Sequence, residues 1–551
     1  MVKVLTNGNG GIYLSSGGNP ILGYDEGDNT VVATGTTEAR TLADRFADII
    51  NVKDFGAVGD GVTDDTIAIN NAQIALAEKG GGILFYPAGT YLVGYYDMSY
   101  IQRASIICKD NIRNIGAGIG STIIKLKNSA SSHVFVMRNA NKITIENMTI
   151  DGNRDNQDVP QEGQPSCGVL IVNNASECSV KNVYIHDTYD YGIGIETNHS
   201  EFLTFENIII ENAGADGIDF KDNSATSKGN ILRGITIKSF GLQTVIEDFA
   251  GVDIRGKVMA SQIRIDSIGT HPANTLRIGI MMHGGNAYDV ISSTSFGSVL
   301  SDFQINGSDS VNTDLSCIGL MLRDSNCSAT NGYIYKVGTG ITIAQKANNL
   351  SNMIIDGCRR GICLDSTLTT GGQPLATYPQ YCNFDNIVVQ NCSLQGIRFE
   401  ANSSYNSMNN VSVTGCGMNI SVNASALSNK FIGGAIFSPV TTNIQDNSNT
   451  TTFTNVYGVV SNKVMESSEF GLTTAGIQTI SINHGLDFIP DVKDITFAIS
   501  VPFAIQDFVI GYPTIRSITS TQIVFKVPII TASADSSVKA KIIAHYNKAN
   551  S

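Results

Sequence analysis

The stretch Asn182-Val183-Tyr184-Ile185, followed after a short polar turn by Gly192-Ile193-Gly194-Ile195, decides the fold of this 551-residue chain. Hydrophobic residues alternate with a period of two, which indicates strands, and Gly, Asn and Asp between the segments indicate tight turns. The phrase recurs in the same order from about residue 140 to residue 440, with copies at 207–220, 235–254, 353–364 and 386–399. Short strands repeated every 20–50 residues or so are typical of a solenoid. We therefore expect a right-handed parallel β-helix; an ordinary β-sandwich is the weaker alternative.

The composition agrees with a long, turn-rich β structure. The chain has 55 glycines, no tryptophan and only 15% charged residues. Its length exceeds the usual range of one domain, so two or three structural units are expected. No apolar run of about 18 residues suggests a membrane span, and the start lacks the apolar segment of a secretory signal. The net charge of −13 argues against nucleic acid as a partner, because phosphate binding needs a basic surface.

The ten cysteines are spread along the chain without a CxxC pair or a Cys/His cluster. Several fall at similar places in the repeat, among them Cys358, Cys392 and Cys416. This favours a buried ladder of reduced, inert thiols. A disulfide framework or a zinc site is the less favoured interpretation, and no metal or cofactor is expected.

The pattern predicts four segments. Residues 1–50 form an N-terminal neck, 51–440 a capped β-helix, 441–470 a linker rich in Ser, Thr and Asn, and 471–551 a small β-sandwich. Residues 37–50 are expected to be a short helix. A second helix is expected after Asp64, and Asp64 or one of its neighbours can cap the N-terminus of this helix. Its apolar residues are expected to be buried: Ile67, Ile69, Ile74 and Leu76.

The segment from Val52 to Tyr91 resembles the N-terminal cap of the pectate-lyase-like β-helix family, in the version found in bacteriophage tailspikes and capsule depolymerases. Residues 39–46 also resemble the neck that enters tailspike β-helices. The resemblance implies a homotrimer in the phage virion that attaches to the tail through its N-terminus and acts at the bacterial cell surface. The family hosts lyases, hydrolases and non-enzymes, so the cap motif is specific for the fold and not for the chemistry. We interpret Asp60, Asp64 and Asp65 as structural residues of this cap.

Aligning the repeat glycines places equivalent residues in columns along one face, about 4.8 Å apart. One outward column contains Gly194, Asp219, Asp253, Met281 and Met321, and its neighbour contains Glu196, Lys221, Arg255, His283 and Arg323. Aspartate is rare in strands, and two carboxylates one rung apart repel, which separates their pKa values into an acid and a base or nucleophile. One-rung spacing is near the about 5–5.5 Å of retaining glycosidases. The alternative is an exposed polar face with charges balanced within each strand.

Other residues are candidates for substrate binding. The interval from Gly217 to Gly251 is longer than its neighbours, and the extra loop carries Glu247 and Asp248. Insertions in a solenoid often build its binding face. Tyr189 and Tyr191 are possible platforms for sugar stacking, though turn aromatics are equally expected there. Further candidates are Lys221, Arg255 and His283.

The sequence thus predicts a tailspike that binds a bacterial capsule or O-antigen and cleaves it by endoglycosidic hydrolysis, with Asp219 and Asp253 as catalytic residues and Glu196 next in line. The motifs of polygalacturonases are largely missing, which argues against hydrolysis of homogalacturonan by their route. One alternative is a polysaccharide lyase that acts by β-elimination on a uronic acid, because the carboxylates and basic groups of a lyase site could be supplied by Asp219, Asp253, Lys221 and Arg255. Another is a non-catalytic receptor-binding fibre. No nucleic acid and no membrane insertion are expected.

Overall fold

The computed structural model describes the following residues, and every statement below concerns them: 3–6, 12–16, 19–24, 30–32, 39–41, 44, 48–96, 103–158, 166–222, 224, 226–243, 248–268, 275–283, 297–308, 314–365, 378–437, 439, 441–448, 450–454, 456, 463–466, 470–471, 476–483, 495–500, 509–510, 513–519, 522–531 and 539–546. The chain divides into two compact units. The first comprises residues 1–189 and 201–208, and the second comprises residues 190–200 and 209–551. Their boundary falls within strands β17 (Ile193–Glu201) and β18 (Thr204–Glu211).

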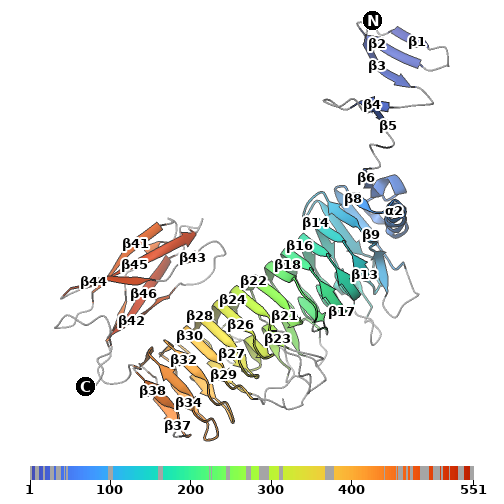
Figure 1. Ribbon diagram of the computed structural model, residues 1–551. Helices are drawn as coiled ribbons and strands as arrows, with labels where there is room; N and C mark the ends of the chain where they lie inside the picture. Colours follow the sequence, from blue (N-terminus) through green and yellow to red (C-terminus); the bar gives the residue numbers. More distant parts are fainter. Residues whose placement is uncertain are drawn as a thin grey trace. The chain divides into compact units, whose positions relative to one another are not determined.

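The first unit begins with small antiparallel sheets and continues into stacked parallel strands (Figure 1). The antiparallel strands are β1 (Lys3–Thr6), β2 (Ile12–Ser16), β3 (Asn19–Tyr24), β4 (Thr30–Val32) and β5 (Ala39–Thr41). The parallel strands are β6 (Ile49–Asn51), β7 (Asp60–Asp64), β8 (Gly82–Tyr86), β9 (Gly89–Val93), β10 (Ala104–Ile107), β11 (Ile112–Gly116), β12 (Thr122–Leu126), β13 (His133–Asn141), β14 (Thr144–Asp151), β15 (Val169–Ser176) and β16 (Ser179–His186).

The expected neck helix at residues 37–50 is correct only in part: Asp44 is helical, but the described residues at both ends of this range lie in strands. Residues 39–41 form strand β5, which pairs with β4, and Ile49–Asn51 form strand β6, which pairs in parallel with β8. Ladder hydrogen bonds to neighbouring strands override the weak helical pattern, because local propensity is only a weak prior.

The cap helix α2 (Thr66–Glu78) is present, and the three cap aspartates bind the backbone around it. Asp60 accepts hydrogen bonds from the Val62 and Thr63 amides, and Asp65 accepts from the Val58 and Gly59 amides.

The apolar face of α2 is narrower than the sequence suggested. Ile69 and Leu76 are buried, but Ile67 is 60% exposed and Ile74 is also exposed. Ile67 and Ile74 lie two positions before Ile69 and Leu76 in the chain, about 200° away around the helix, so burying one pair turns the other away from the core.

The second unit contains two long ladders of parallel strands, which form the stacked rungs of a parallel β-helix, so the expected fold class is confirmed. The first ladder is β19 (Ile218–Asp222), β21 (Phe249–Arg255), β23 (Arg277–His283), β25 (Cys317–Arg323), β27 (Thr339–Ile343), β29 (Arg360–Leu364), β31 (Gln395–Phe399), β34 (Met418–Val422) and β37 (Thr442–Asp446). The second is β20 (Asn230–Ile237), β22 (Val258–Ile265), β24 (Val299–Asn306), β26 (Ser328–Tyr335), β28 (Asn349–Asp356), β30 (Asn383–Gln390), β32 (Ser407–Asn409), β33 (Ser412–Thr414), β35 (Lys430–Ile432), β36 (Ala435–Phe437) and β38 (Thr452–Thr454).

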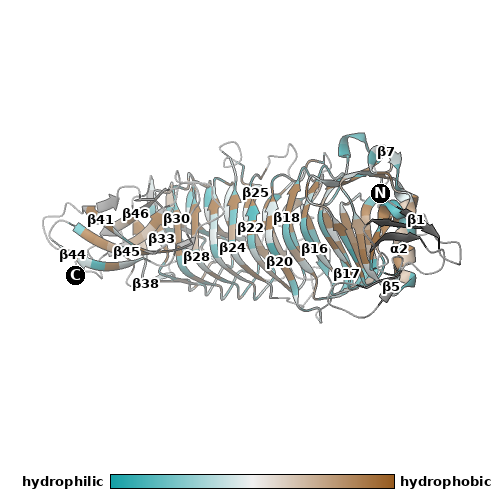
Figure 2. Cartoon of the chain, turned by 90° about the horizontal axis from the view of Figure 1, so that it is seen from above, coloured by the Kyte–Doolittle hydropathy of each residue, from teal (hydrophilic) through white to brown (hydrophobic). Residues whose placement is uncertain are grey.

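Alternation along each strand creates the core. In Figure 2, brown and teal residues alternate along the stacked strands around β22, β24 and β28. Isoleucine, valine and leucine side chains stack in the interior, as at Ile218, Val252 and Ile280. All ten cysteines are free and buried, as expected from their repeat positions.

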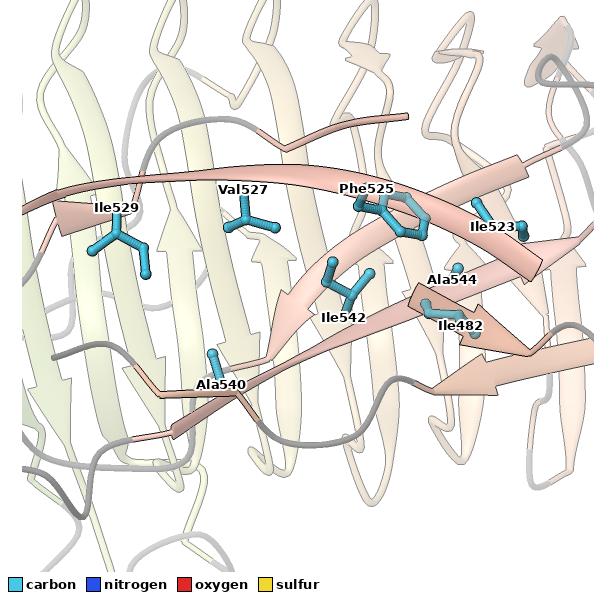
Figure 3. Close-up of a cluster of buried hydrophobic side chains, with 8 residues drawn as sticks. All are labelled: Ile482, Ile523, Phe525, Val527, Ile529, Ala540, Ile542 and Ala544. Atoms are coloured by element: carbon cyan, nitrogen blue, oxygen red, sulfur yellow. The ribbon is translucent and has the colours of Figure 1, made fainter. Parts of the chain in front are cut away.

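The C-terminal strands form two four-stranded antiparallel sheets. One contains β39 (Lys463–Glu466), β40 (Phe470–Gly471), β42 (Ile495–Ser500) and β46 (Lys539–Tyr546), and the other contains β41 (Gly476–Asn483), β43 (Val509–Ile510), β44 (Thr514–Ile518) and β45 (Gln522–Thr531). Buried side chains from both sheets make one hydrophobic cluster around Phe525, Ile482 and Ile542 (Figure 3). Within the described part of the chain, no helix is both long and apolar enough to cross a membrane.

Candidate functional site

The two columns expected from the repeat alignment exist. Gly194 pairs with Asp219, Asp219 with Asp253, and Asp253 with Met281 on neighbouring strands. In the adjacent column, Glu196 pairs with Lys221 and Lys221 with Arg255. Because successive side chains of a strand alternate between faces, Asp219 and Lys221 share the face opposite to the buried Ile218 and Phe220. The register therefore brings Glu196, Asp219, Lys221, Asp253 and Arg255 together.

The two aspartates are not exposed, contrary to the polar-face alternative. Each is only 1% exposed. Their column continues into Met281 and Met321, which pack with Ala250, Ile278 and Ile318 in an apolar cluster. Apolar neighbours and long basic side chains therefore exclude water from these carboxylates.

Ion pairs neutralise both aspartates. The Lys221 ammonium contacts Asp219 Oδ2, and Arg255 Nη2 lies 3.0 Å from Asp253 Oδ2 and 3.8 Å from Asp219 Oδ1. Burial alone would lower the pKa of Lys221 and of Arg255, but the aspartates outweigh it and raise both. Both basic groups are thus held as cations, and their side chains are 23% and 17% exposed. A partly exposed cationic layer covers a buried anionic one.

A third carboxylate, Asp216, joins this cluster. One carboxylate oxygen each of Asp216, Asp219 and Asp253 can be chosen so that the three atoms all lie within 4.8 Å of one another. Asp216 Oδ1 accepts a hydrogen bond from the Ala250 amide at 2.6 Å. Burial, and then the negative charges of Asp219 and Asp253, raise the pKa of Asp216 well above its usual value. Asp216 therefore holds its proton more tightly than an ordinary carboxylic acid does, and it lies beside two ion-paired carboxylates.

Two more groups border the cationic layer. The Lys221 ammonium lies 3.1 Å from the Tyr191 hydroxyl and 4.7 Å from the centre of its ring. It also lies 3.9 Å from Glu196 Oε1, and Glu196 is partly exposed. Tyr191 and Glu196 thus offer a phenol and a carboxylate at the solvent side of Lys221.

The remaining candidates have different outcomes. Asp248 is partly buried, and its carboxylate accepts a hydrogen bond from the Leu276 amide at 2.6 Å; burial raises its pKa. Tyr189 is partly buried in the turn before β17. Glu247 and the side chain of His283 lie outside the described residues.

The sequence interpretation missed Asp216 and gave no role to Arg323. Asp216 precedes the repeat glycine, and the paired positions in the next rungs are Ala250 and Ile278. The sequence signal that could have identified Asp216 is that a carboxylate stands at a repeat position that is apolar in the next two rungs. Arg323 stands in the basic column, where burial lowers its pKa against the opposing effect of Asp253.

Three described groups of side chains could hold a cation: Asp216, Asp219 and Asp253; Asp151, His186 and Asp187; and Cys363, Asp365 and Glu400. In each group a basic side chain already neutralises one carboxylate. These are Lys221 at Asp219, Lys125 at Asp151 and Arg398 at Glu400. A metal ion would have to displace that side chain, so the geometry fits ion pairs better than a resident metal.

Part of the chain, including four of these carboxylates, matches a known protein family. Residues 49–254, which include Glu196, Asp216, Asp219 and Asp253, match the family described as rhamnogalacturonase A/epimerase, pectate lyase-like. Alginate lyase 7 of Azotobacter vinelandii is 34% identical over 174 residues, which cover 30% of this chain and 20% of that protein. Mannuronan C5-epimerase AlgE2 of the same organism is 31% identical over 208 residues, which cover 36% of this chain and 20% of that protein. The similarity thus spans about a fifth of the length of each of these relatives.

Solved structures are also similar. The tailspike protein of E. coli bacteriophage HK620, in complex with a pentasaccharide, has a TM-score of 0.46 and 12% identity, covering 95% of this chain and 98% of that one. The A-module of mannuronan C-5 epimerase AlgE6 from Azotobacter vinelandii has a TM-score of 0.44 and 15% identity, covering 75% and 100%.

Proposed function

We propose that this chain, whose residues 49–254 carry a pectate-lyase-like domain, is a tailspike depolymerase that binds a bacterial capsule or O-antigen and hydrolyses its glycosidic bonds. The cleavage site is the face formed by Asp216, Asp219 and Asp253. The fold and the similarity to polysaccharide-modifying enzymes support a polysaccharide as substrate.

The observation that carries the hydrolytic mechanism is a buried carboxyl group with a raised pKa, Asp216, whose carboxylate lies within 4.8 Å of two ion-paired carboxylates. Asp216 has a strongly raised pKa, so it can donate a proton to the leaving oxygen. Asp219 or Asp253 is then the nucleophile. Separated protonation states of neighbouring carboxylates are the arrangement that glycoside hydrolysis requires. Separations within 4.8 Å are close to the about 5–5.5 Å of retaining enzymes and well short of the about 6.5–9.5 Å of inverting ones.

The burial of the aspartates defines the kind of sugar that can reach them. Lys221 and Arg255 stand between solvent and Asp219 and Asp253. A substrate with its own carboxylate can draw these cations outward, because opposite charges attract strongly where water is scarce. When Lys221 and Arg255 pair with the carboxylate of the substrate, Asp219 and Asp253 would become accessible to the sugar. We therefore propose that the polysaccharide contains an acidic sugar.

The site of action and the assembly follow from the same proposal. The protein is a homotrimer in the phage tail, joined to the particle through its N-terminus, and it acts at the bacterial surface. Residues 471–551, which carry the two C-terminal sheets apart from β39 and Phe470, serve trimer assembly or carbohydrate binding.

A second candidate function is β-elimination on a uronic acid. The specific observation is the contact of Lys221 with Tyr191, which places a cation and a phenol side by side at the solvent edge. The cation would neutralise the uronate carboxylate, Tyr191 as a phenolate would take the proton from C5, and the resulting phenol would give a proton to the leaving O4 as the double bond forms. Similarity to an alginate lyase favours this candidate as well.

One experiment separates the two chemistries. Purified protein is incubated with a panel of bacterial capsular polysaccharides and O-antigens. New reducing ends without ultraviolet absorbance of a conjugated double bond support hydrolysis. Reducing ends with that absorbance support the lyase, and binding without any shortening of the polymer contradicts both.

A further inference from the structure

A pair of stacked tyrosines is exposed on the second unit. The ring centres of Tyr381 and Tyr405 are 5.4 Å apart and their planes differ by 9°. The two residues are 58% and 49% exposed. Single exposed apolar residues are ordinary on protein surfaces, but adjacent large ones mark binding sites more often. Core packing does not account for this pair.

The backbone at both tyrosines is in the left-handed region. Equivalent positions at successive rungs form a column that lies just before strands β28, β30, β32 and β35. Each position is two residues before a residue that pairs with the neighbouring strand. In order, the column contains Ala347, Tyr381, Tyr405 and Ser428. Their φ angles lie between 56° and 62°. A left-handed backbone is costly for a bulky side chain, whereas Asn and Gly tolerate it. The same conformation recurs at Asn326, one rung before Ala347, and at Phe202, so it belongs to the turn, and this pair differs from these positions in carrying two adjacent stacked aromatic rings.

The outer ring faces of the pair have only small neighbours in this column. Ala347 precedes Tyr381 and Ser428 follows Tyr405, and neither side chain is long enough to cover a phenol ring. Within the described part of the chain, the two phenol hydroxyls make no hydrogen bond. The pair thus offers flat apolar faces and free hydroxyl groups to a ligand.

We propose that Tyr381 and Tyr405 form a sugar-binding platform that holds the polysaccharide apart from the cleavage site. This inference rests on the proposed function for the identity of the ligand. Pyranose C–H groups can pack on the electron-rich face of an aromatic ring, and phenol hydroxyls can exchange hydrogen bonds with sugar hydroxyls. Strand β21 carries Asp253, and β29 is the strand of the same ladder that precedes Tyr381 in the chain. These two strands are four rungs apart, which corresponds to about 20 Å at the usual strand spacing. A long polymer bound here is retained near the carboxylates between cleavage events.

The test measures binding of full-length protein to immobilised bacterial capsular polysaccharides and O-antigens by interferometry. The double variant Tyr381→Asn/Tyr405→Asn removes both rings but keeps residues that tolerate the left-handed backbone. For any polymer that the parent protein binds, we expect the Kd of the double variant to be at least tenfold higher. Its melting temperature should equal that of the parent or exceed it. The matched control is Phe202→Asn, since Phe202 is also an exposed aromatic with a φ of 55°. Its binding should equal that of the parent.

Each outcome decides the proposal. Parent-like binding by the double variant overturns it, as does a parent protein that binds no polymer of the panel. A lower melting temperature assigns the rings a structural role and also overturns it. If the double variant loses binding but the parent shortens no polymer, the platform stands and the proposed cleavage fails.

Discussion

Asp216 and Asp219 are three residues apart with carboxylate oxygens within 4.8 Å, yet their surroundings differ. Asp219 contacts the ammonium of Lys221. Asp216 accepts a hydrogen bond from the Ala250 amide, and burial next to other carboxylates raises its pKa well above the usual value. One rung of the solenoid therefore places a carboxyl group with a raised pKa next to a carboxylate that is paired with a lysine.

Neutralising the ion-paired carboxylates should abolish cleavage. We expect Asp219→Asn and Asp253→Asn each to lower turnover at least 100-fold, because general-acid and nucleophile losses are of that size. Each change also removes the nearest carboxylate partner of one cation, Lys221 or Arg255. Removing one member of a buried pair costs about 3–5 kcal/mol, and partial exposure of Lys221 and Arg255 reduces this to about 2 kcal/mol. Turnover assays and thermal unfolding check both expectations.

The control for that pair of variants is Asp64→Asn in the cap. Asp64 bonds to Thr66 and Lys127, so its loss can lower stability without touching the carboxylate cluster. Normal turnover in Asp219→Asn and Asp253→Asn would place the cleavage site elsewhere.

Lys221 should control affinity for acidic substrate. Replacement by Met keeps most of the side-chain volume but removes the charge that faces solvent. We expect KM to rise at least tenfold and to depend less on salt than in the parent, because fewer charges then attract the polymer. Steady-state kinetics at two ionic strengths check this. An unchanged KM with an unchanged salt dependence would contradict the role of Lys221 in binding an acidic sugar.

The repeat alignment predicted the rung register well because the repeat glycines mark equivalent positions. It paired Asp219 with Asp253 and Lys221 with Arg255, as the strands do. It did not predict burial of the two aspartates, since burial depends on side chains from adjacent rungs and on the loops around them. The stacking of Tyr381 on Tyr405 was equally inaccessible, because no local pattern distinguishes that corner from other turns.

The thiols should be reactive only in unfolded protein. Burial raises the pKa of Cys317, Cys358 and Cys363 to about 12, so the reactive thiolate is scarce and inaccessible. Labelling with a thiol reagent at neutral pH should modify none of the ten cysteines before denaturation and all of them afterwards. Native disulfides found by mass spectrometry would contradict the buried ladder.

The chain should form a trimer that resists heat and detergent, because stacked rungs and associated termini unfold slowly. Light scattering at micromolar concentration should return three times the mass of the chain. A monomer mass would count against the tailspike assignment.

The pH dependence of turnover by the parent and by Asp216→Asn tests the central claim most directly. Burial and the neighbouring carboxylates raise the pKa of Asp216, so the donor keeps its proton to a higher pH than an ordinary carboxylic acid, and parental activity should fall as pH rises through that pKa. Asparagine resembles the neutral acid in shape, so the variant should fold normally, lose at least 100-fold in turnover and lack this alkaline limb. An Asp216→Asn protein that retains parental turnover with the same alkaline limb would contradict the account.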